Sequence, residues 1–240
     1  MKINKNISVV TVNFNNSVGL RKTLNSIHLS NTKPKEIIII DSESADMPHK
    51  VVEDFVEVLD IKFVSEKDKG IYDGMNKGAK LVKTKYVHYL NSGDEIFGDV
   101  YSDINEECLL PVKIFDEDEK FLGYDFIKAF GTGYNHQGII FSSDHPLYDL
   151  SYSIAADGDV MNKHFKNGLS KLKIKSSGGV NYYLGGISTK KTTLGNIELI
   201  RSLLKNRPHN WIFTIIYLLL KLLTFRRFRR YIYKFVVRVQ

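Results

Sequence analysis

Three polar clusters in the first half of the chain hold residue types that can bind a charged ligand: residues 41–46 (DSESAD), 66–78 (EKDKGIYDGMNKG) and 91–95 (NSGDE). The carboxylates and hydroxyls of the first can accept hydrogen bonds from a base or ribose. In the second, Lys69 and Gly70 can approach a phosphate through an ammonium and the backbone. The acidic end of the third suits a divalent cation held by oxygen ligands. Each cluster also has a plain structural explanation as a helix cap, an exposed helix start or a turn.

The elements around these clusters alternate between strand and helix. Short β-branched runs are typical of strands buried in a parallel sheet, and the segments between them have helical spacing of apolar residues. Each cluster follows a strand at its carboxyl end, the edge at which open parallel α/β sheets bind ligands. The pattern predicts strands at residues 7–12, 36–41, 61–64, 86–90, 135–141 and 180–188, and helices at 16–27, 51–59, 73–82 and 155–165.

The charge of the chain is unevenly distributed. The 240 residues include 34 Lys and Arg and 27 Asp and Glu, for a net charge of +7. Residues 201–240 hold ten of the basic residues and no acidic one, which leaves 24 basic and 27 acidic residues before them, a net charge of −3. A nucleic-acid-binding domain needs its basic residues spread over the face that meets the phosphates, so this distribution argues against one.

Composition limits the class of protein further. With 43% hydrophobic residues, the chain can bury a sizeable core in one large domain or two small ones. The single cysteine, Cys108, excludes an intrachain disulfide and a multi-cysteine zinc site and favours a reducing, cytosolic setting. The first residues have no apolar run with a small-residue cleavage site, so we expect no signal peptide.

Taken together and in this order, the clusters resemble glycosyltransferase family 2. The matching segments are ISVVTVNFNN, IIIIDSESAD and SEKDKGIYDGMNKGAKLVKTKYVHYLNSGD, and the last resembles the bacterial polysaccharide-assembly branch. The likeness is close over residues 7–98, looser over 131–188 and absent from the tail. It implies a GT-A fold of the α/β class, a Rossmann-like, mixed but mainly parallel sheet flanked by helices.

The resemblance also implies the donor site. It places a UDP- or GDP-sugar against the loops after the first strands, with Asp41 reading the uracil or guanine and Lys69 as a further phosphate partner. Asp94 matches the second carboxylate of the family's Asp-any-Asp metal motif, whereas Ser92 replaces the first. A divalent cation, Mg²⁺ or Mn²⁺, would thus rest on Asp94, the donor diphosphate and waters. The remaining donor contacts implied are Thr11, Asn13, Asn15, Asp73 and Asn76.

Sugar transfer needs a base for the acceptor hydroxyl. The segment 154–159 (IAADGD) resembles the one that carries the family's catalytic aspartate, so Asp157 is assigned as base and Asp159 as the reserve. Alternatively, Asp157 only caps the helix that follows. His136, in a His-Gln pair common in this branch, is placed near the acceptor and the phosphates, or else is a structural histidine.

The C-terminal part suggests a membrane contact. Residues 211–223 are nearly all apolar but too short to span a bilayer, and beyond them apolar and basic residues alternate at helical spacing. We therefore predict a catalytic domain at 1–194, with a nucleotide half at 1–98 and an acceptor half at 99–194. Residues 195–240 would form a basic, amphipathic helical tail on an anionic membrane surface. The alternative is that this tail packs onto the domain or onto another subunit.

The leading hypothesis is a metal-dependent, inverting glycosyltransferase. It would be cytoplasmic, peripheral on the inner face of the cell membrane, and would extend a saccharide acceptor that is lipid-linked; a homo-oligomer is compatible with it. The alternative is a catalytically silent nucleotide-sugar-binding or scaffold subunit, which Ser92 favours. A sugar nucleotidyltransferase is disfavoured because TVNFNNSVG lacks a Gly-rich, Arg-containing phosphate loop.

Overall fold

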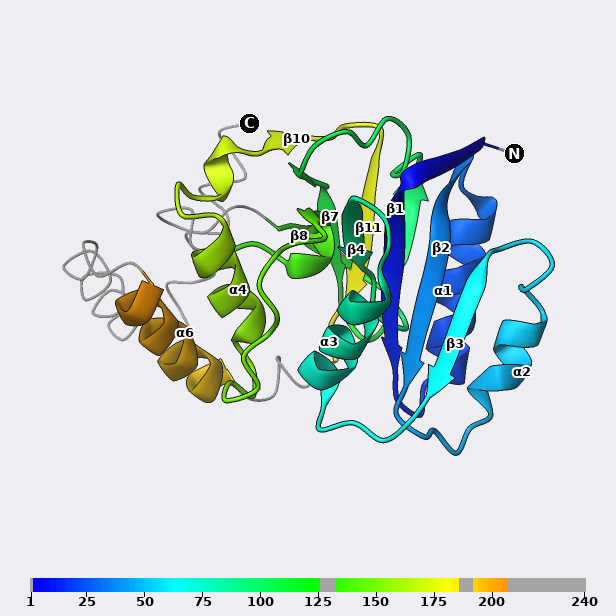
Figure 1. Cartoon of the computed structure of the whole chain (residues 1–240), viewed down its shortest axis with the longest axis horizontal. Helices are drawn as coiled ribbons and strands as arrows, with labels where there is room; N and C mark the ends of the chain where they lie inside the picture. Colours follow the sequence, from blue (N-terminus) through cyan, green and yellow to red (C-terminus); the bar gives the residue numbers. More distant parts are fainter. Residues whose placement is uncertain (1, 126–132, 186–191, 207–240) are drawn as a thin grey trace.

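The computed structural model describes residues 2–125, 133–185 and 192–206. Two sheets organise them (Figure 1). The larger has the strand order β10-β6-β9-β4-β1-β2-β3, and the smaller has the order β5-β11-β7-β8. The strands of the larger sheet are β1 (Lys2–Asn13), β2 (Thr32–Asp41), β3 (Ile61–Ser65), β4 (Tyr86–Tyr89), β6 (Cys108–Leu109), β9 (Ile139–Ser142) and β10 (Lys173–Ile174). Those of the smaller are β5 (Glu95–Gly98), β7 (Val112–Phe115), β8 (Phe121–Tyr124) and β11 (Gly178–Tyr183).

The first half of the larger sheet is parallel: β1 pairs with β2 and β4, and β2 pairs with β3. β9 runs antiparallel to β4 and β6, so the sheet is mixed. Residues 37–40 of β2 are at most 1% exposed, as expected for a β-branched run covered on both faces. The predicted α/β fold with a mixed, mainly parallel sheet is confirmed.

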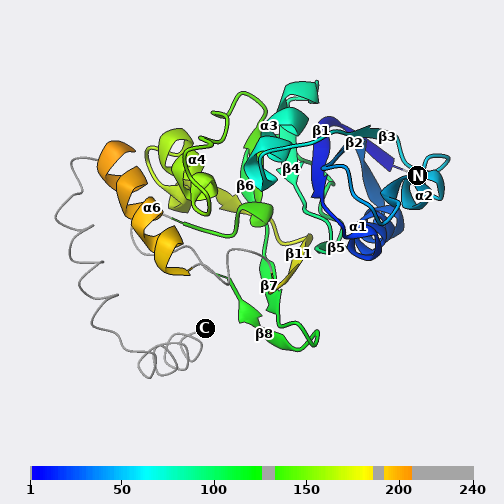
Figure 2. The ribbon, with the colours of Figure 1, turned by 90° about the horizontal axis from the view of Figure 1, so that it is seen from below.

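Helices cover both faces of this sheet. The described helices are α1 (Ser17–Leu29), α2 (Pro48–Glu53), α3 (Ile71–Leu81), α4 (Ala156–His164) and α6 (Thr192–Asn206), with 3₁₀ turns η2 (His136–Gly138) and η3 (Leu169–Lys171). Figure 2 shows α3 on one face of β1 and β2 and α1 on the other. The close approach of α3 requires a glycine, because a Cβ at Gly78 would lie 2.4 Å from Val10 Cγ1.

Three predicted elements differ in extent or type. The strand predicted at 180–188 is β11, which begins at Gly178 and ends at Tyr183. The helix predicted at 51–59 is α2, which ends at Glu53 and continues as turns. The strand predicted at 135–141 begins as η2, and only its second part is β9. In η2 the Asn135 side chain accepts a hydrogen bond from the backbone N–H of Gln137 at 3.0 Å, which favours a tight turn over an extended entry.

The chain returns along the side of α4. α6 packs against α4 at the end of the molecule away from β3 (Figures 1 and 2). α6 includes the first residues assigned to the tail, 195–206, while residues 207–240 and the amphipathic helix predicted there lie outside the described part of the chain. No described helix is long and apolar enough to cross a membrane. The domain boundaries stay a prediction.

Candidate active site

The first part of the candidate site is a loop built around Asp41, at the end of β2. Its carboxylate is 1% exposed and accepts hydrogen bonds from Asn13 Nδ2 at 2.8 Å, Ser44 Oγ at 2.5 Å, Ser44 N at 3.0 Å and Ser65 Oγ at 2.8 Å. Burial raises the pKa of Asp41, but these donors outweigh it and the pKa is lowered. Asp41 thus holds a negative charge that orders the loop, and a base could bond it only by displacing one of these donors.

Asn15 and Asn13 continue this loop, whereas Thr11 does not. Asn15 has φ 48°, donates its backbone N–H to Ser44 Oγ at 2.8 Å and accepts from Ala45 N at 2.9 Å through Oδ1. Asn13 Oδ1 is buried without a hydrogen-bond partner in the described residues. Thr11 is 0% exposed inside β1, so its side chain does not reach the surface in this structure.

The start of α3 forms the next side of the edge. Asp73 Oδ2 accepts the backbone N–H of Lys69 at 3.0 Å, and the Lys69 side chain is exposed to solvent. Asn76 lies one turn further and is 6% exposed. Its amide donates to the Tyr148 carbonyl at 2.9 Å and accepts from Tyr148 N at 2.8 Å. The structure therefore keeps Asp73 and Lys69 at the edge but uses Asn76 to hold the backbone of the second half.

Asp94 lies beneath this edge, at the start of β5. It is 6% exposed, and its Oδ1 accepts the backbone N–H of Tyr183 at 2.9 Å. Burial raises the pKa of Asp94 to about 7, although Tyr183 and the Gln137 side chain, both hydrogen-bonded to it, oppose the shift. Ser92 Oγ, two residues earlier, is buried without a hydrogen-bond partner in the described residues.

The His136-Gln137 pair meets the loop of Asp94. Gln137 Oε1 accepts from Asn91 N at 2.9 Å, and its carbonyl accepts from His88 Nε2 at 2.7 Å, so the turn is anchored on both sides. His136 is close enough for its charge to lower the pKa of Asp94. Its Nε2 is buried with no hydrogen-bond partner among the described residues. His136 therefore has one ring nitrogen without a hydrogen-bond partner in the described residues, and that atom is shielded from solvent.

Asp157 completes the cluster from the first turn of α4. His136 Nδ1 lies 3.5 Å from Asp157 Oδ2, and the Tyr72 hydroxyl lies 3.3 Å from Asp157 Oδ1. The Asp157 side chain is 27% exposed, so a substrate can reach it. Asp159 is 0% exposed, with Lys163 Nζ at 2.5 Å and Asn206 Nδ2 at 2.8 Å from its oxygens. Of the two aspartates, the structure places only Asp157 beside His136.

Tyr72 is a residue that sequence reasoning missed. Its hydroxyl donates to the Ile154 carbonyl besides facing Asp157, and burial first, then Asp157, raises its pKa. Its ring stacks on Tyr148 with centroids 5.5 Å apart. The only sequence signal was an aromatic residue next to Asp73 at a helix start, which is more often a core residue.

The donor atoms around Asp94 fit a cation held only with the help of a substrate. No three His, Cys, Asp or Glu residues gather into a metal-binding group within the described ranges. Asp94 offers one carboxylate, and the unpartnered Ser92 Oγ and His136 Nε2 are neutral donors. Mg²⁺ commonly takes one or two carboxylates, waters and substrate phosphates, so this donor set suits it when a diphosphate is present.

Comparison with known proteins finds relatives of the first half of the chain. Residues 8–105 match the model of the glycosyl transferase family 2. The poly-beta-1,6-N-acetyl-D-glucosamine synthase of Staphylococcus epidermidis is 33% identical over 94 residues, which are 39% of this chain. The match spans only 23% of that relative's length.

The fold resembles that of solved structures of TarS from S. aureus. Residues 1–349 of TarS align with a TM-score of 0.62 and 15% identity, over 86% of this chain and 66% of that one. The same fragment in complex with UDP-GlcNAc aligns with a TM-score of 0.62 and 16% identity, over 86% and 68%. At this identity the likeness concerns the fold. Residues 8–105 thus match glycosyltransferase family 2, and the described part of the chain has the GT-A fold.

Proposed function

We propose that the protein transfers a sugar from a nucleoside diphosphate donor to a saccharide acceptor. The observation that carries the proposal is the cluster of Asp94, His136 and Asp157, which joins the metal-motif loop to an accessible carboxylate at the sheet edge. The family match and the UDP-GlcNAc complex of TarS support a UDP-sugar as donor. A GDP-sugar is the second donor class, and a hexose or an N-acetylhexosamine the sugar transferred.

The residues can divide the chemistry of transfer between them. The acceptor oxygen bonds to the anomeric carbon as the bond from that carbon to the diphosphate oxygen breaks, and the electron pair leaves with the nucleoside diphosphate. Asp157 takes the acceptor proton, with Tyr72 and His136 holding its two oxygens in place. A single displacement of this kind inverts the anomeric configuration.

The diphosphate side needs positive charge as the donor leaves. The exposed Lys69 ammonium would supply part of it, and His136 Nε2 would donate a hydrogen bond to the diphosphate. The backbone N–H groups of Lys69 and Gly70 are bonded to Asp73 and Asp68. A divalent cation held by Asp94 and the donor would neutralise the leaving diphosphate. Asp41 and the loop it orders receive the nucleoside.

The proposal also includes the acceptor and the place in the cell where it is extended. The synthase relative makes a polysaccharide, which supports a role in cell-surface polysaccharide assembly. A lipid-linked acceptor at the inner face of the membrane would explain the ten basic residues of 201–240, because each Lys or Arg near an anionic surface contributes about 1 kcal/mol of binding.

A catalytically silent, nucleotide-sugar-binding subunit is the second candidate, and Ser92 in the metal motif favours it. To separate the two, the purified protein is incubated with UDP-GlcNAc, UDP-glucose, UDP-galactose and GDP-mannose, each with Mg²⁺ or Mn²⁺. Nucleoside diphosphate release is measured, and donor binding is measured by calorimetry. We expect slow hydrolysis of one donor class in the absence of acceptor. Binding of a donor without release from any of them, even with added membrane extract as acceptor, would favour the silent subunit.

A further inference from the structure

Glu198 of α6 binds the backbone of the segment that carries Asp157. Its Oε1 accepts from Ser153 N at 2.8 Å, and its Oε2 accepts from Ile154 N at 2.8 Å and from Ala155 N at 3.0 Å. The side chain is 8% exposed, so these bonds are shielded from water. A single carboxyl group therefore satisfies three consecutive backbone donors at the entrance to α4.

This arrangement matters because these N–H groups have no partners of their own inside a helix. Ser153 and Ile154 precede α4 and Ala155 is its N-cap residue, so no carbonyl of the helix accepts from their N–H groups. The helix dipole also favours negative charge near this end. Glu198 supplies both the acceptor and the charge from another helix, 43 to 45 residues further along the chain.

The rest of the same face of α6 locks onto α4 and the segment before it. The helices are in close contact, since a Cβ at Gly158 would lie 2.9 Å from Leu199 Cδ1 and a Cβ at Gly195 would lie 2.9 Å from Ile154 Cγ2. Polar contacts extend this interface: Arg201 over the Tyr152 ring at 5.2 Å, Asn162 to Ser202 at 3.2 Å, Lys205 to Asp149 at 3.6 Å and Asn206 to Asp159 at 2.8 Å. α6 is thus a fixed support for the segment.

On the other side the segment is held by α3. The Tyr72 hydroxyl donates to the carbonyl of Ile154, whose N–H is bonded to Glu198. Asp157 follows two residues after Ala155 and faces the same hydroxyl. Its position is therefore determined from two directions, by Tyr72 of the nucleotide half and by Glu198 of α6.

We propose that Glu198 is a positioning residue for the base and that α6 is part of the active site rather than of a separate tail. The proposal rests on the proposed function, in which Asp157 takes the acceptor proton. Displacement of a catalytic group by about 1 Å can cost about 10²-fold in rate. Loss of the Glu198 bonds should thus lower turnover while the donor, which binds on the other half, still binds.

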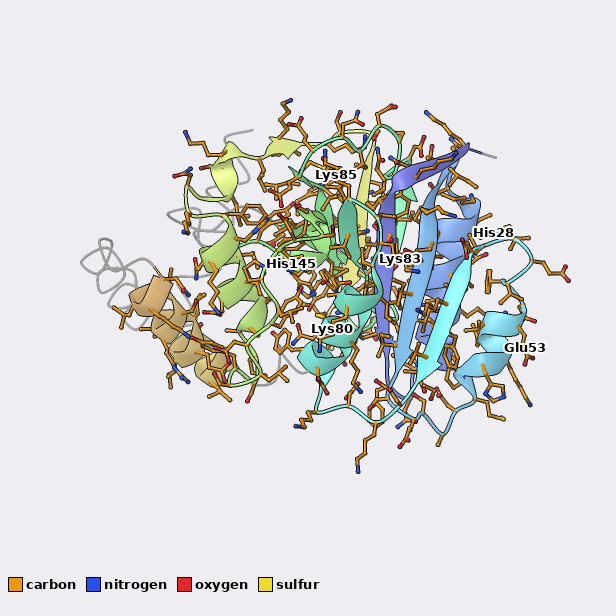
Figure 3. All side chains as sticks on the ribbon, viewed as in Figure 1. His28, Glu53, Lys80, Lys83, Lys85 and His145 are labelled. Carbon is orange, nitrogen blue, oxygen red and sulfur yellow. The ribbon has the colours of Figure 1, made fainter. Side chains whose placement is uncertain are left out.

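The test compares Glu198→Gln and Glu198→Asp with the wild type in the full-length protein. In Glu198→Gln an amide N–H replaces one of the oxygens that accept hydrogen bonds from the backbone, so at least one backbone N–H loses its acceptor. We expect kcat for nucleoside diphosphate release to fall at least about tenfold, with the donor KM within about twofold. Glu198→Asp keeps the charge and should recover part of the rate. Glu53→Gln, at an exposed residue of α2 at the far end of the molecule (Figure 3), is the matched control and should change neither.

Two further variants separate positioning from general stability. Ser202→Ala removes a contact of the same interface to Asn162, and it should lower the melting temperature but leave kcat unchanged. In an Asp157→Asn background, Glu198→Gln should cause little further loss, because its effect acts through the base. The positioning role is wrong if the wild type is active and Glu198→Gln has the same kcat. It is also wrong if the fold-losses in kcat of Asp157→Asn and Glu198→Gln multiply in the double variant. A wild type that turns over no donor overturns the proposed function, and this role with it.

Discussion

The side chain of Asn76 is bonded to both backbone groups of Tyr148, at 2.9 Å to the carbonyl and 2.8 Å from the N–H. Asn76 lies in α3, in the half that carries the nucleotide loops, and Tyr148 lies 72 residues later. A side-chain amide paired in this way replaces a strand neighbour for a segment that has none. It keeps the Tyr148 ring stacked on Tyr72, beside Asp157.

Asn76→Ala should therefore destabilise the protein without weakening donor binding. Two buried backbone groups lose their partners, which costs about 2–4 kcal/mol of unfolding free energy. Urea denaturation measures this loss, and calorimetry with the donor is run well below the midpoint. Asn167→Ala, at an exposed asparagine, is the control and should change little. A fall in donor affinity of the folded variant would instead support the nucleotide contact implied by family resemblance.

The elements near the start of the chain were predictable because their signals are local. A β-branched run such as residues 37–40 identifies a buried strand by itself, and the polar loop after it follows from the geometry of a parallel sheet. The roles of single polar residues were harder to predict, because their partners lie far away in the chain. No local sequence pattern predicts such pairs, which include Asn76 with Tyr148, Tyr72 with Asp157, and Glu198 with Ala155.

The choice between Asp157 and Asp159 shows the same limit. Two residues apart on a helix, they point about 200° apart, so only one can face the sheet edge. Sequence alone ranked Asp157 first by resemblance. The structure gives a physical reason, since Asp159 is bonded to Asn206 of α6 and is fully buried.

Asp157→Asn should remove most turnover. The amide cannot accept the acceptor proton, and general-base catalysis typically contributes about 10²–10⁴-fold to the rate. The shape and the hydrogen bond from Tyr72 are retained, so melting temperature and donor KM should stay close to those of the wild type. Asp159→Asn is the comparison: it loses the ion pair with Lys163 and should lower stability more than turnover. Full transfer activity of Asp157→Asn would show that the base lies elsewhere.

Metal binding should depend on the nucleotide. Asp94 is the one acidic residue of its loop that is buried beneath the edge, so we expect weak Mn²⁺ binding by the free protein and tighter binding with UDP. Ser92→Asp adds a second carboxylate in the metal motif and should raise the affinity of the free protein for Mn²⁺. Ser143→Asp, on an exposed loop, is the matched control. Calorimetric titration with Mn²⁺ measures both, and equal affinity with and without UDP would contradict the shared site.

His88 should lower the free energy of unfolding as the pH drops from about 6.5 to 4. Asp94, whose pKa is raised to about 7, acts in the opposite direction over this range, so the effect of His88 is the difference between the wild type and a His88 variant. Burial lowers the pKa of His88 from 6.5 to about 4, so the unfolded chain takes up a proton in this range that the folded protein does not. This difference in protonation lowers the free energy of unfolding by at most about 3 kcal/mol below pH 4, and by nothing above about pH 6.5. His88→Gln should reduce the slope of unfolding free energy against pH while lowering stability at pH 8, because bonds to Gln137 and Tyr101 change.

Other groups also contribute to the slope in that variant. His145 (Figure 3) is also buried, and its pKa is also lowered, so it contributes in the same direction. His49→Gln, at an exposed histidine, serves as the control and should keep the slope of the wild type. An unchanged slope in His88→Gln would mean that His88 is not responsible for the acid sensitivity.

Two C-terminal truncations should separate vesicle binding from turnover. Residues 207–240 contain eight basic residues and no acidic one, and α6 ends at Asn206. Ending the chain after Asn206 should release the protein from vesicles that contain anionic lipid, while Glu198 keeps its bonds and donor hydrolysis continues. Ending it after residue 191 removes α6 as well, so turnover should be lost together with vesicle binding. Co-sedimentation and nucleoside diphosphate release measure the two effects on the same samples. Vesicle binding by the chain that ends at Asn206 would place the membrane contact on the folded body instead.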